Sequence, residues 1–335
     1  MTVTMPALDP GAGHDSISAG HWRYWLLCAA VYVSLLYSVG LHPVMSIETP
    51  LEMGHFTGRG DALGADAWKL TRFAGDVERY MEQAEGTLTD APWRYRVLPL
   101  AVAGTIGRFM PTAWAFIVMN AVATLTTAML YTWFLRDHGL SKHIALLGGV
   151  LFLTMSPAVA TMAYPMVDPA SFLAALAVFV ALERRHAVGF VVASIAAVLT
   201  KEVLALGGLL WLIRHRTWVA VVPLVAFFAV RLALGWESVP PDISRLADVQ
   251  QLLWVNWGGT ADILLRVFMA FSFLWLGLVN IRGTWLQPYV VLIPIVIGAA
   301  VAYSSHIERP MGILFPIVIT SFLYFFERPT QPTSP

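Results

Sequence analysis

Long apolar stretches separated by short polar connections occupy most of this 335-residue chain. Only 13% of its residues are charged and 58% are hydrophobic, whereas a soluble domain carries about 25% charged residues. So few charges cannot cover a globule that faces water, and we expect an all-α polytopic membrane protein with about ten or eleven transmembrane or partial helices. The stretches are 24–44, 97–110, 112–135, 142–163, 168–183, 188–200, 203–213, 217–235, 260–281, 286–304 and 310–326.

Some of these stretches are too short to cross a bilayer, which takes about 20 apolar residues. Short segments are stable in a membrane where other protein or a water-filled cavity surrounds them. We therefore expect one bundle with a cleft on one side, formed by a single transmembrane domain over residues 22–328. A disordered lead (1–21) and a disordered tail (329–335) are expected on either side of it.

Charge and cysteine content exclude several classes of function. The net charge is zero and no long basic run occurs, so no nucleic-acid partner is expected. The single cysteine, Cys28, allows neither an intrachain disulfide nor a cysteine-based metal site. No internal repeat of the kind found in transporters is visible.

Basic loops orient the expected bundle, because cytoplasmic loops are rich in Lys and Arg. The residues that mark the cytoplasmic side are Arg23, Arg136, Lys142, Arg184, Arg185, Arg214, Arg216, Arg282 and Arg328. Segment 45–96 is then the first extracytoplasmic loop. In that arrangement 97–110 and 112–135 cannot both cross, so either 97–110 is re-entrant or the loop with Arg136 breaks the rule.

The first outer loop is expected to contain two short interfacial helices, near 61–73 and 76–85. In the second, apolar residues recur at i, i+3, i+4 and i+7, which predicts one apolar stripe that lies on the bilayer or on the bundle. The stripe consists of Val77, Tyr80, Met81 and Ala84.

Unexpected ionisable residues gather on the predicted outer side, where four distant segments meet. Such groups in an apolar chain are costly and indicate function, although charges at helix ends in water are the alternative for each one. They are Asp76, Arg94, Arg96, Asp168, Lys201, Glu202, His306, Glu308 and Arg309.

Each candidate has a structural alternative. Asp76 suits a helix N-cap or a general base, with Asp66 as the rival carboxylate. Arg94 and Arg96 suit interfacial anchors, but their planar guanidinium groups also match phosphate oxygens. Asp168, directly before Pro169, fits an N-cap.

Lys201 and Glu202 interrupt a very apolar stretch. Adjacent residues cannot share a helix face, so we expect one to meet a partner in the cleft and the other to cap a helix break. The guanidinium groups of Arg94 and Arg96, together with Lys201 and Arg309, are more cations than membrane anchoring needs. This number favours a phosphate site.

The order of these motifs resembles the polytopic GT-C glycosyltransferases, the class of protein mannosyltransferases, arabinofuranosyltransferases and aminoarabinose transferases. The resemblance covers about residues 20–326. Its motifs are D-x-x-x-Y-x-x-x-A (Asp76, Tyr80, Ala84), Y-R-x-L-P (Tyr95, Arg96, Leu98, Pro99), Asn120, P-x-x-D-P (Pro165, Asp168, Pro169), T-K-E (Thr200, Lys201, Glu202) and E-R-P (Glu308, Arg309, Pro310).

The resemblance implies transfer of a sugar from a polyprenyl-phosphate donor to a glycan, lipid or protein acceptor. The active site would face outward from a bacterial cytoplasmic membrane. Asp76 would be the catalytic base with Asp66 in reserve, and basic residues would hold the donor phosphate. The expected phosphate-binding residues are Arg94, Arg96, Lys201 and Arg309, and the other site-lining residues are Tyr80, Tyr95, Asp168, Glu202, His306 and Glu308.

The larger members of this class have a soluble C-terminal domain, whereas this chain is expected to be a compact form without one. No zinc-protease, P-loop or dinucleotide motif is present in a fitting context, so these motifs indicate no cofactor. The acidic residues of 61–90 leave room for a divalent cation such as Mg²⁺ or Mn²⁺, although no ligand spacing demands it.

Two other functions remain open. A lipid-linked-sugar transporter or flippase would use the same cations, but its charges would line a full transmembrane path. A membrane acyl- or phosphotransferase would favour a central histidine. Its candidates, His143 and His306, both lie at segment ends.

Overall fold

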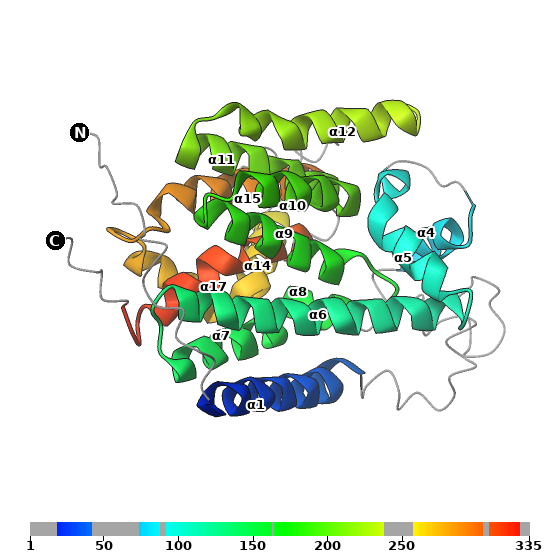
Figure 1. Cartoon of the computed structure of the whole chain (residues 1–335). Helices are drawn as coiled ribbons and strands as arrows, with labels where there is room; N and C mark the ends of the chain where they lie inside the picture. Colours follow the sequence, from blue (N-terminus) through cyan, green and yellow to red (C-terminus); the bar gives the residue numbers. More distant parts are fainter. Residues whose placement is uncertain are drawn as a thin grey trace.

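The computed structural model describes residues 19–41, 74–87, 92–162, 164–237, 257–303 and 308–328. Helices dominate these ranges and no strand occurs in them, which confirms the all-α prediction (Figure 1). The α-helices are α1 (Ala19–Leu35), α4 (Ala74–Ala84), α5 (Val97–Ile106), α6 (Thr112–Asp137), α7 (Lys142–Thr154), α8 (Ser156–Met162), α9 (Asp168–Glu183), α10 (Ala187–Thr200), α11 (Gly207–His215), α12 (Val222–Ala233), α14 (Trp257–Phe271), α15 (Leu292–Tyr303), α16 (Glu308–Met311) and α17 (Phe315–Leu323).

Short helical pieces of other geometry extend or join these helices. A π-helix continues α1, and the remaining pieces are 3₁₀ helices that mostly precede or follow an α-helix. The π-helix is Leu36–Leu41, and the 3₁₀ helices are Trp93–Tyr95, Glu202–Leu206, Trp218–Val221, Ser272–Asn280, Gln287–Val291 and Gly312–Leu314.

Two predicted boundaries are wrong. The stretch 142–163 forms two helices rather than one, because the chain leaves helical geometry at Met155 (ψ 142°) and Pro157, in the first turn of the second helix, has no N–H with which to continue the first. Helix α1 begins at Ala19, inside the segment expected to be a disordered lead. The rest of that lead, the tail at 329–335 and the short helix expected at 61–73 lie outside the described residues.

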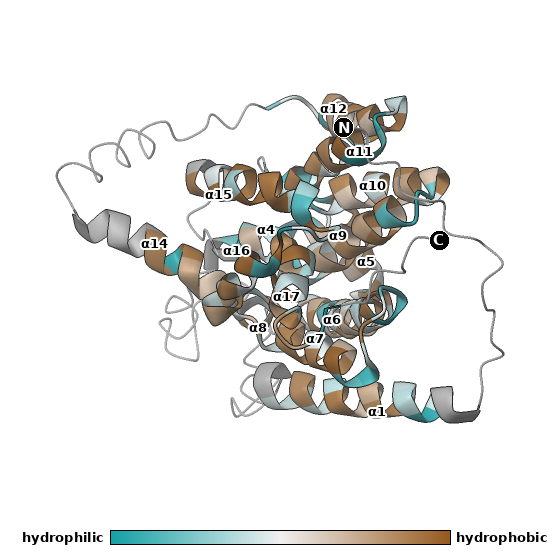
Figure 2. Cartoon of the chain, turned by 90° about the vertical axis from the view of Figure 1, so that its left-hand side faces the viewer, coloured by the Kyte–Doolittle hydropathy of each residue, from teal (hydrophilic) through white to brown (hydrophobic). Residues whose placement is uncertain are grey.

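Several connections between helices that carry Arg and Lys lie at one end of the bundle, which we call the basic end. Arg184 Nη2 lies 3.0 Å from Asp137 Oδ2, which links the ends of α9 and α6. The backbone N–H of Ser141 donates to Glu327 at 3.1 Å, and His215 lies 2.8 Å from the Leu182 carbonyl oxygen. Figure 2 faces this end, where hydrophilic connections flank mostly hydrophobic helices.

The opposite end, which we call the network end, holds α4, α5 and the start of α9 (Figure 1). Helix α5 has 10 residues and is about 15 Å long, whereas the 26 residues of α6 extend about 39 Å. After α5 the chain turns at 107–110 and enters α6 at this same end. Helix α5 therefore does not run the length of the bundle, in agreement with the re-entrant alternative for 97–110.

A small hydrophobic core at the network end holds α4 against α5 and α6. Its buried members include Val77, Tyr80 and Met81 of the predicted apolar stripe, together with Leu100 and Phe116, and the fourth residue of the stripe, Ala84, is partly buried against them. The stripe thus packs on the bundle. The larger core fills the rest of the bundle between α1, α6, α7, α9, α10, α11, α15 and α17.

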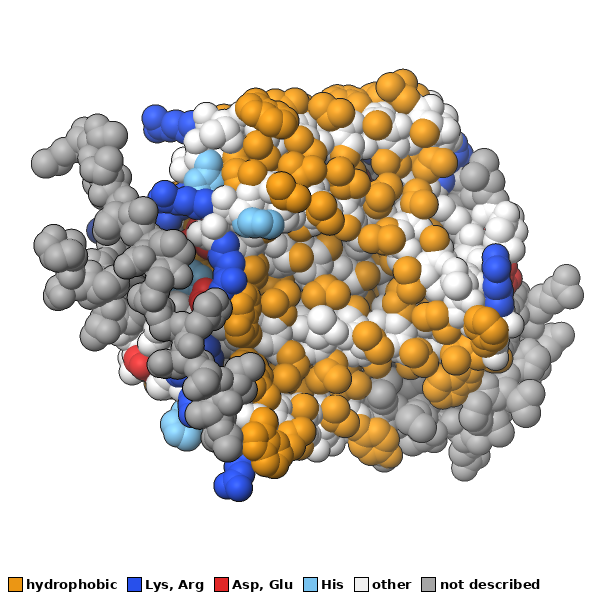
Figure 3. Space-filling model, in the orientation of Figure 1, with side chains coloured by type: hydrophobic (Ala, Val, Ile, Leu, Met, Phe, Trp, Pro, Cys, Tyr) orange, Lys and Arg blue, Asp and Glu red, His pale blue; other side chains and the backbone are white. Residues whose placement is uncertain are grey.

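On the face that Figure 3 shows, the middle of the bundle is hydrophobic, while Lys and Arg side chains lie towards its two ends. Exposed apolar residues on different helices include Val122, Val192, Leu232, Leu264 and Phe273. Among the described helices, only α6 is both long and apolar enough to cross a membrane by itself; the other apolar helices are shorter.

A close helix approach makes Gly277 a sensitive position. A Cβ atom at Gly277 would fall on the backbone of Phe322, which cannot move aside as a flexible side chain can. We expect Gly277→Ala to lower the free energy of unfolding by about 1–3 kcal/mol, the usual cost of overpacking. Thermal unfolding of the purified protein in detergent measures this change.

Gly298 in α15 provides the matched control, because a Cβ atom there would have no neighbour within 4 Å. Gly298→Ala should leave stability unchanged or raise it by up to about 1 kcal/mol, since glycine is unfavourable inside a helix. Equal unfolding temperatures for the two variants would contradict the close packing at Gly277.

Candidate functional site

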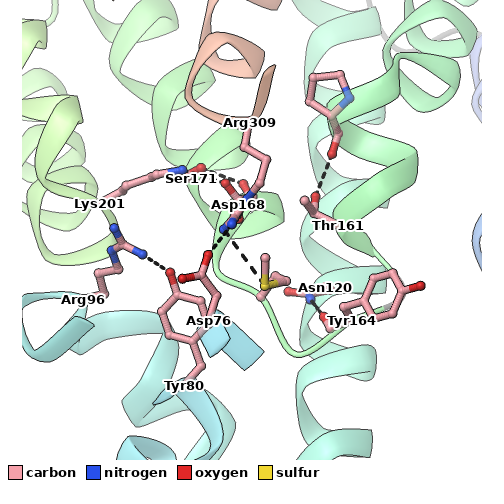
Figure 4. A network of polar contacts seen from close by, with 12 residues as sticks. Asp76, Tyr80, Arg96, Asn120, Thr161, Tyr164, Asp168, Ser171, Lys201 and Arg309 are labelled. Atoms are coloured by element: carbon pink, nitrogen blue, oxygen red, sulfur yellow. Dashed lines mark hydrogen bonds and ion pairs between the residues drawn. The ribbon is translucent and has the colours of Figure 1, made fainter. Parts of the chain in front are cut away.

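Asp168 is the centre of a buried ionic network at the network end (Figure 4). Its side chain is fully buried, and each carboxylate oxygen meets a cation. Lys201 Nζ donates to Oδ1 at 2.6 Å, and Arg309 donates to Oδ2 through Nη2 at 2.6 Å and Nε at 3.2 Å. One carboxylate thus joins the start of α9 to the ends of two other segments.

Asp168 does not cap its helix, contrary to the N-cap alternative. It is the first residue of α9, Val167 holds the cap position, and Pro169 follows in the first turn. The backbone carbonyl of Asp168 accepts a hydrogen bond from Ser171 Oγ at 2.7 Å, while its carboxylate points to the cations. Asp168 therefore makes a local hydrogen bond with its backbone and long-range ion pairs with its side chain.

Lys201 and Glu202 both find partners because the chain is extended between two helices. Helix α10 ends at Thr200, Lys201 has φ −159° and ψ 126°, and a 3₁₀ helix begins at Glu202. Neighbouring side chains point in different directions in extended backbone. The break was predicted, but the expectation that only one of the two meets a partner was wrong.

Glu202 pairs with Arg96 in a two-bonded contact. Arg96 Nη2 donates to Glu202 Oε1 at 3.0 Å, and Nε donates to Oε2 at 3.3 Å. Arg96 Nη1 also contacts the Tyr80 hydroxyl, and its guanidinium lies 5.5 Å from the centre of the Tyr80 ring. The network therefore includes the phenol that α4 buries against the bundle.

Asp76 joins the network through Arg309. Its Oδ2 contacts Arg309 Nη1, and its Oδ1 accepts a hydrogen bond from Trp93 Nε1 at 3.1 Å. Helix α4 begins at Ala74, so Asp76 lies in the first turn rather than at the cap, where a negative charge is still favoured by the helix dipole. The side chain is 24% exposed, in contrast to Asp168.

Opposite charges set the protonation states of the network. Burial raises the pKa of Asp76, but Arg309 and then Arg96 outweigh it and hold that pKa below its usual range. Burial likewise opposes ionisation of Glu202, and Arg96 again brings its pKa below the usual range. Burial lowers the pKa of Lys201, and Asp168 only partly offsets this effect. The carboxyl groups of Asp76 and Glu202 are thus ionised at neutral pH.

Two predicted site residues lie elsewhere. Arg94 Nη2 is 2.8 Å from Glu237 Oε2, beyond the end of α12. The Tyr95 hydroxyl donates to the Gly235 carbonyl at 2.9 Å and accepts from the Glu237 N–H at 3.0 Å. Arg231 stacks on the Tyr95 ring at 4.3 Å. Arg94 and Tyr95 therefore attach segment 92–96 to α12 and contact no carboxylate of the network.

Three of the remaining predicted residues cannot be placed. Asp66 and His306 lie outside the described residues, and the Glu308 side chain is not described either. Sequence reasoning missed Trp93 as a partner of Asp76, although it directly precedes Arg94 in the same polar stretch. It also missed Met166, whose Sδ lies 4.0 Å from Arg309 Nη2.

Asn120 is another buried polar residue near the network. Its Nδ2 donates to the Tyr164 carbonyl at 2.8 Å, and its Oδ1 has no hydrogen-bond partner among the described residues. The described residues contain no group of three or more His, Cys, Asp or Glu side chains placed to hold a metal ion. The chemistry that the network offers is proton acceptance by carboxylates and anion binding by ammonium and guanidinium groups.

Removal of the central carboxylate should strongly destabilise the protein. Asp168→Asn leaves Lys201 and Arg309 buried without their shared counter-charge, and breaking a buried ion pair in this way costs about 3–5 kcal/mol. Thermal and denaturant unfolding in detergent should show this loss.

Asp137→Asn is the matched control, since its ion pair with Arg184 is largely exposed and should contribute at most about 1 kcal/mol. If both variants lost the same stability, Asp168 would not be the centre on which the network depends.

Comparisons of the chain with models of protein families, with curated proteins and with solved structures gave no significant match.

Proposed function

We propose that this protein is a polytopic membrane glycosyltransferase that transfers a sugar from a polyprenyl-phosphate donor to an acceptor on the extracytoplasmic side. The observation that carries this proposal is the meeting of Asp76, Arg96, Lys201 and Arg309 in one network (Figure 4). Asp76 and Arg96 come from the predicted first outer loop, and Lys201 and Arg309 come from two segments far down the chain. They supply the two functions that such a transfer needs, a base and a grip on phosphate.

The hydrophobic surface supports a membrane location. Large apolar side chains are exposed on α1, α6, α10, α12 and α14, with Lys and Arg towards the two ends (Figure 3). Apolar patches of this extent are unusual on soluble proteins. Helix α5 is shorter than a full span; α4, α6 and α10 pack against one side of it, and Leu98 and Val102 are exposed on the other. Short helices of this kind are tolerated in a membrane where other protein packs beside them.

The cations suit a phosphate leaving group. As the glycosidic bond breaks, negative charge develops on the donor phosphate, and preorganised cations in a site shielded from water stabilise it. Lys201 and Arg309 are almost fully buried, so their charges are little screened. Arg96 adds a third cation next to them.

Asp76 suits the general base. Among the described carboxylates of the network, it is the one that lies in the predicted first outer loop and meets its cation through a single oxygen, and its side chain is as exposed as that of Glu202. In the proposed step the acceptor hydroxyl gives its proton to Asp76, and its oxygen bonds to the anomeric carbon. The bond from that carbon to the phosphate oxygen breaks, and the electron pair leaves with polyprenyl phosphate.

An apolar pocket whose walls continue two segments of the network suits the donor's lipid tail. It lies between α9, α11, α15 and the segment 313–317. Val203 and Leu204 in its wall directly follow Lys201 and Glu202, while Ile313 and Leu314 follow Arg309 closely. A lipid whose phosphate binds these cations would thus find apolar surface next to its first isoprene units.

Loss of the base should abolish transfer without unfolding the protein. We expect Asp76→Asn to reduce release of polyprenyl phosphate from polyprenyl-phosphate sugars at least about 100-fold, because general base catalysis contributes about that much or more. The assay uses purified protein with mannose, arabinofuranose and aminoarabinose donors and a membrane extract as acceptor. Chromatography measures the released lipid phosphate.

Glu78→Gln is the matched control, because Glu78 is an exposed carboxylate on the same helix. It should keep the full rate, and both variants should unfold at nearly the same temperature as the unaltered protein. Full activity of Asp76→Asn would exclude Asp76 as the base, and absence of transfer with every donor would exclude the proposed substrates.

The orientation of the bundle can be tested with single cysteines. In a Cys28→Ser background, Glu85→Cys places a thiol on the exposed end of α4, and Arg282→Cys places one at the basic end. We expect a membrane-impermeant maleimide to label Glu85→Cys in intact spheroplasts. Arg282→Cys should react only after the membrane is permeabilised.

Equal labelling of the two positions in intact spheroplasts would contradict a bundle that spans the membrane. The reverse pattern would show that the network end faces the cytoplasm. A denatured sample of each variant provides the control that both thiols react when they are fully accessible.

A further inference from the structure

The charges of the network are already balanced. Among the described residues, the cations Arg96, Lys201 and Arg309 meet the carboxylates of Asp76, Asp168 and Glu202. A phosphate that entered this network would add negative charge to a place where every cation has an anionic partner. An anionic ligand can therefore bind tightly only if one carboxylate gives up its cation.

Asp168 and Glu202 are poorly suited to give way. Asp168 is fully buried and holds two cations with its two oxygens, so its release would leave both without a counter-charge. Glu202 makes two parallel bonds to Arg96, the geometry that gives a guanidinium–carboxylate pair its strength.

Asp76 is the carboxylate that can leave at the lowest cost. Among the described residues it contacts one cation, Arg309, and through one oxygen. Its side chain is partly exposed, so water can solvate the carboxylate once it leaves Arg309. Arg309 meanwhile keeps Asp168, which holds it in position through Nε and Nη2, while the exchange takes place at Nη1.

We propose that Asp76 occupies the position on Arg309 Nη1 to which an oxygen of the donor phosphate binds. The donor then displaces Asp76 from Arg309 and so releases the base. This inference rests on the proposed function, and it makes the binding order compulsory. In the empty site Asp76 is held by Arg309, and the phosphate must displace it before Asp76 can accept a proton from the acceptor.

Two further observations fit this exchange. Arg309 is a main reason why the pKa of Asp76 lies below its usual range. When Asp76 loses its contact with Arg309, it therefore becomes a better proton acceptor. Trp93 Nε1 holds the other oxygen, Oδ1, and so keeps the carboxylate near the site while Oδ2 turns away from Arg309. An acceptor that arrives before the donor meets a base that is still paired.

The exchange predicts that loss of the Asp76 charge strengthens phosphate binding. If Asp76 is bound to Arg309 Nη1 in about nine-tenths of the molecules without ligand, removal of the Asp76 charge raises the apparent affinity for the phosphate about ten-fold. We would measure equilibrium binding of farnesyl phosphate to the purified full-length protein in detergent. Asp76→Asn and Asp76→Ser should both bind it about ten-fold more tightly than the unaltered protein.

Matched controls separate this effect from general changes in charge. Glu78→Gln removes one exposed carboxylate from the same helix and should bind farnesyl phosphate as the unaltered protein does. Farnesol, which lacks the phosphate, should bind all variants equally. Arg309→Gln should weaken farnesyl phosphate binding at least about ten-fold.

The possible results distinguish the exchange from the proposed function. If the unaltered protein binds farnesyl phosphate through Arg309 but neither Asp76 variant binds it more tightly, the exchange is wrong while the phosphate site stands. If no variant binds farnesyl phosphate better than farnesol, both are overturned. Tighter binding by both Asp76 variants supports the exchange whether or not sugar transfer is detected.

Discussion

A fully buried carboxylate must be neutralised, and Asp168 meets this requirement with two cations at once. The arrangement of the network end depends on that pairing. It fixes the start of α9 relative to the break after α10 and relative to Arg309 in α16. Arg309 then reaches Asp76 in α4, so elements that do not follow one another in the chain are joined by charge as well as by hydrophobic packing.

The base and the cations stand on different parts of the structure. Asp76 belongs to α4, which packs in the small core with α5 and the start of α6. Lys201 directly follows α10, a helix of the large core, and Arg309 lies in α16, which also contributes to that core. The contact between Asp76 and Arg309 bridges these two packing units. In the proposed transferase, the step that exchanges this contact would therefore act where the two units meet, with little disturbance of the large core.

Hydrophobic patterning predicted the helices well, and outlying charges in an apolar chain singled out the network residues Asp76, Arg96, Lys201 and Arg309. Their pairing could not be predicted, because each partner lies far away in the sequence. The directions of Arg94 and Arg96 were equally inaccessible. They lie two residues apart around a 3₁₀ turn with about 120° per residue, so one faces α12 and the other faces Glu202. The N-cap signals at Asp76 and Asp168 were local, and long-range ion pairs outweighed them.

The extended backbone at Lys201 gives the order of two neighbouring residues a specific meaning. Lysine faces a carboxylate and glutamate faces a guanidinium only because they occur in that order. If the two letters were exchanged, the composition, hydropathy and net charge of the chain would not change. Lysine would then meet Arg96, and glutamate would meet Asp168. Two repulsions would replace two attractions, so a chain of identical composition would lose this end of its structure.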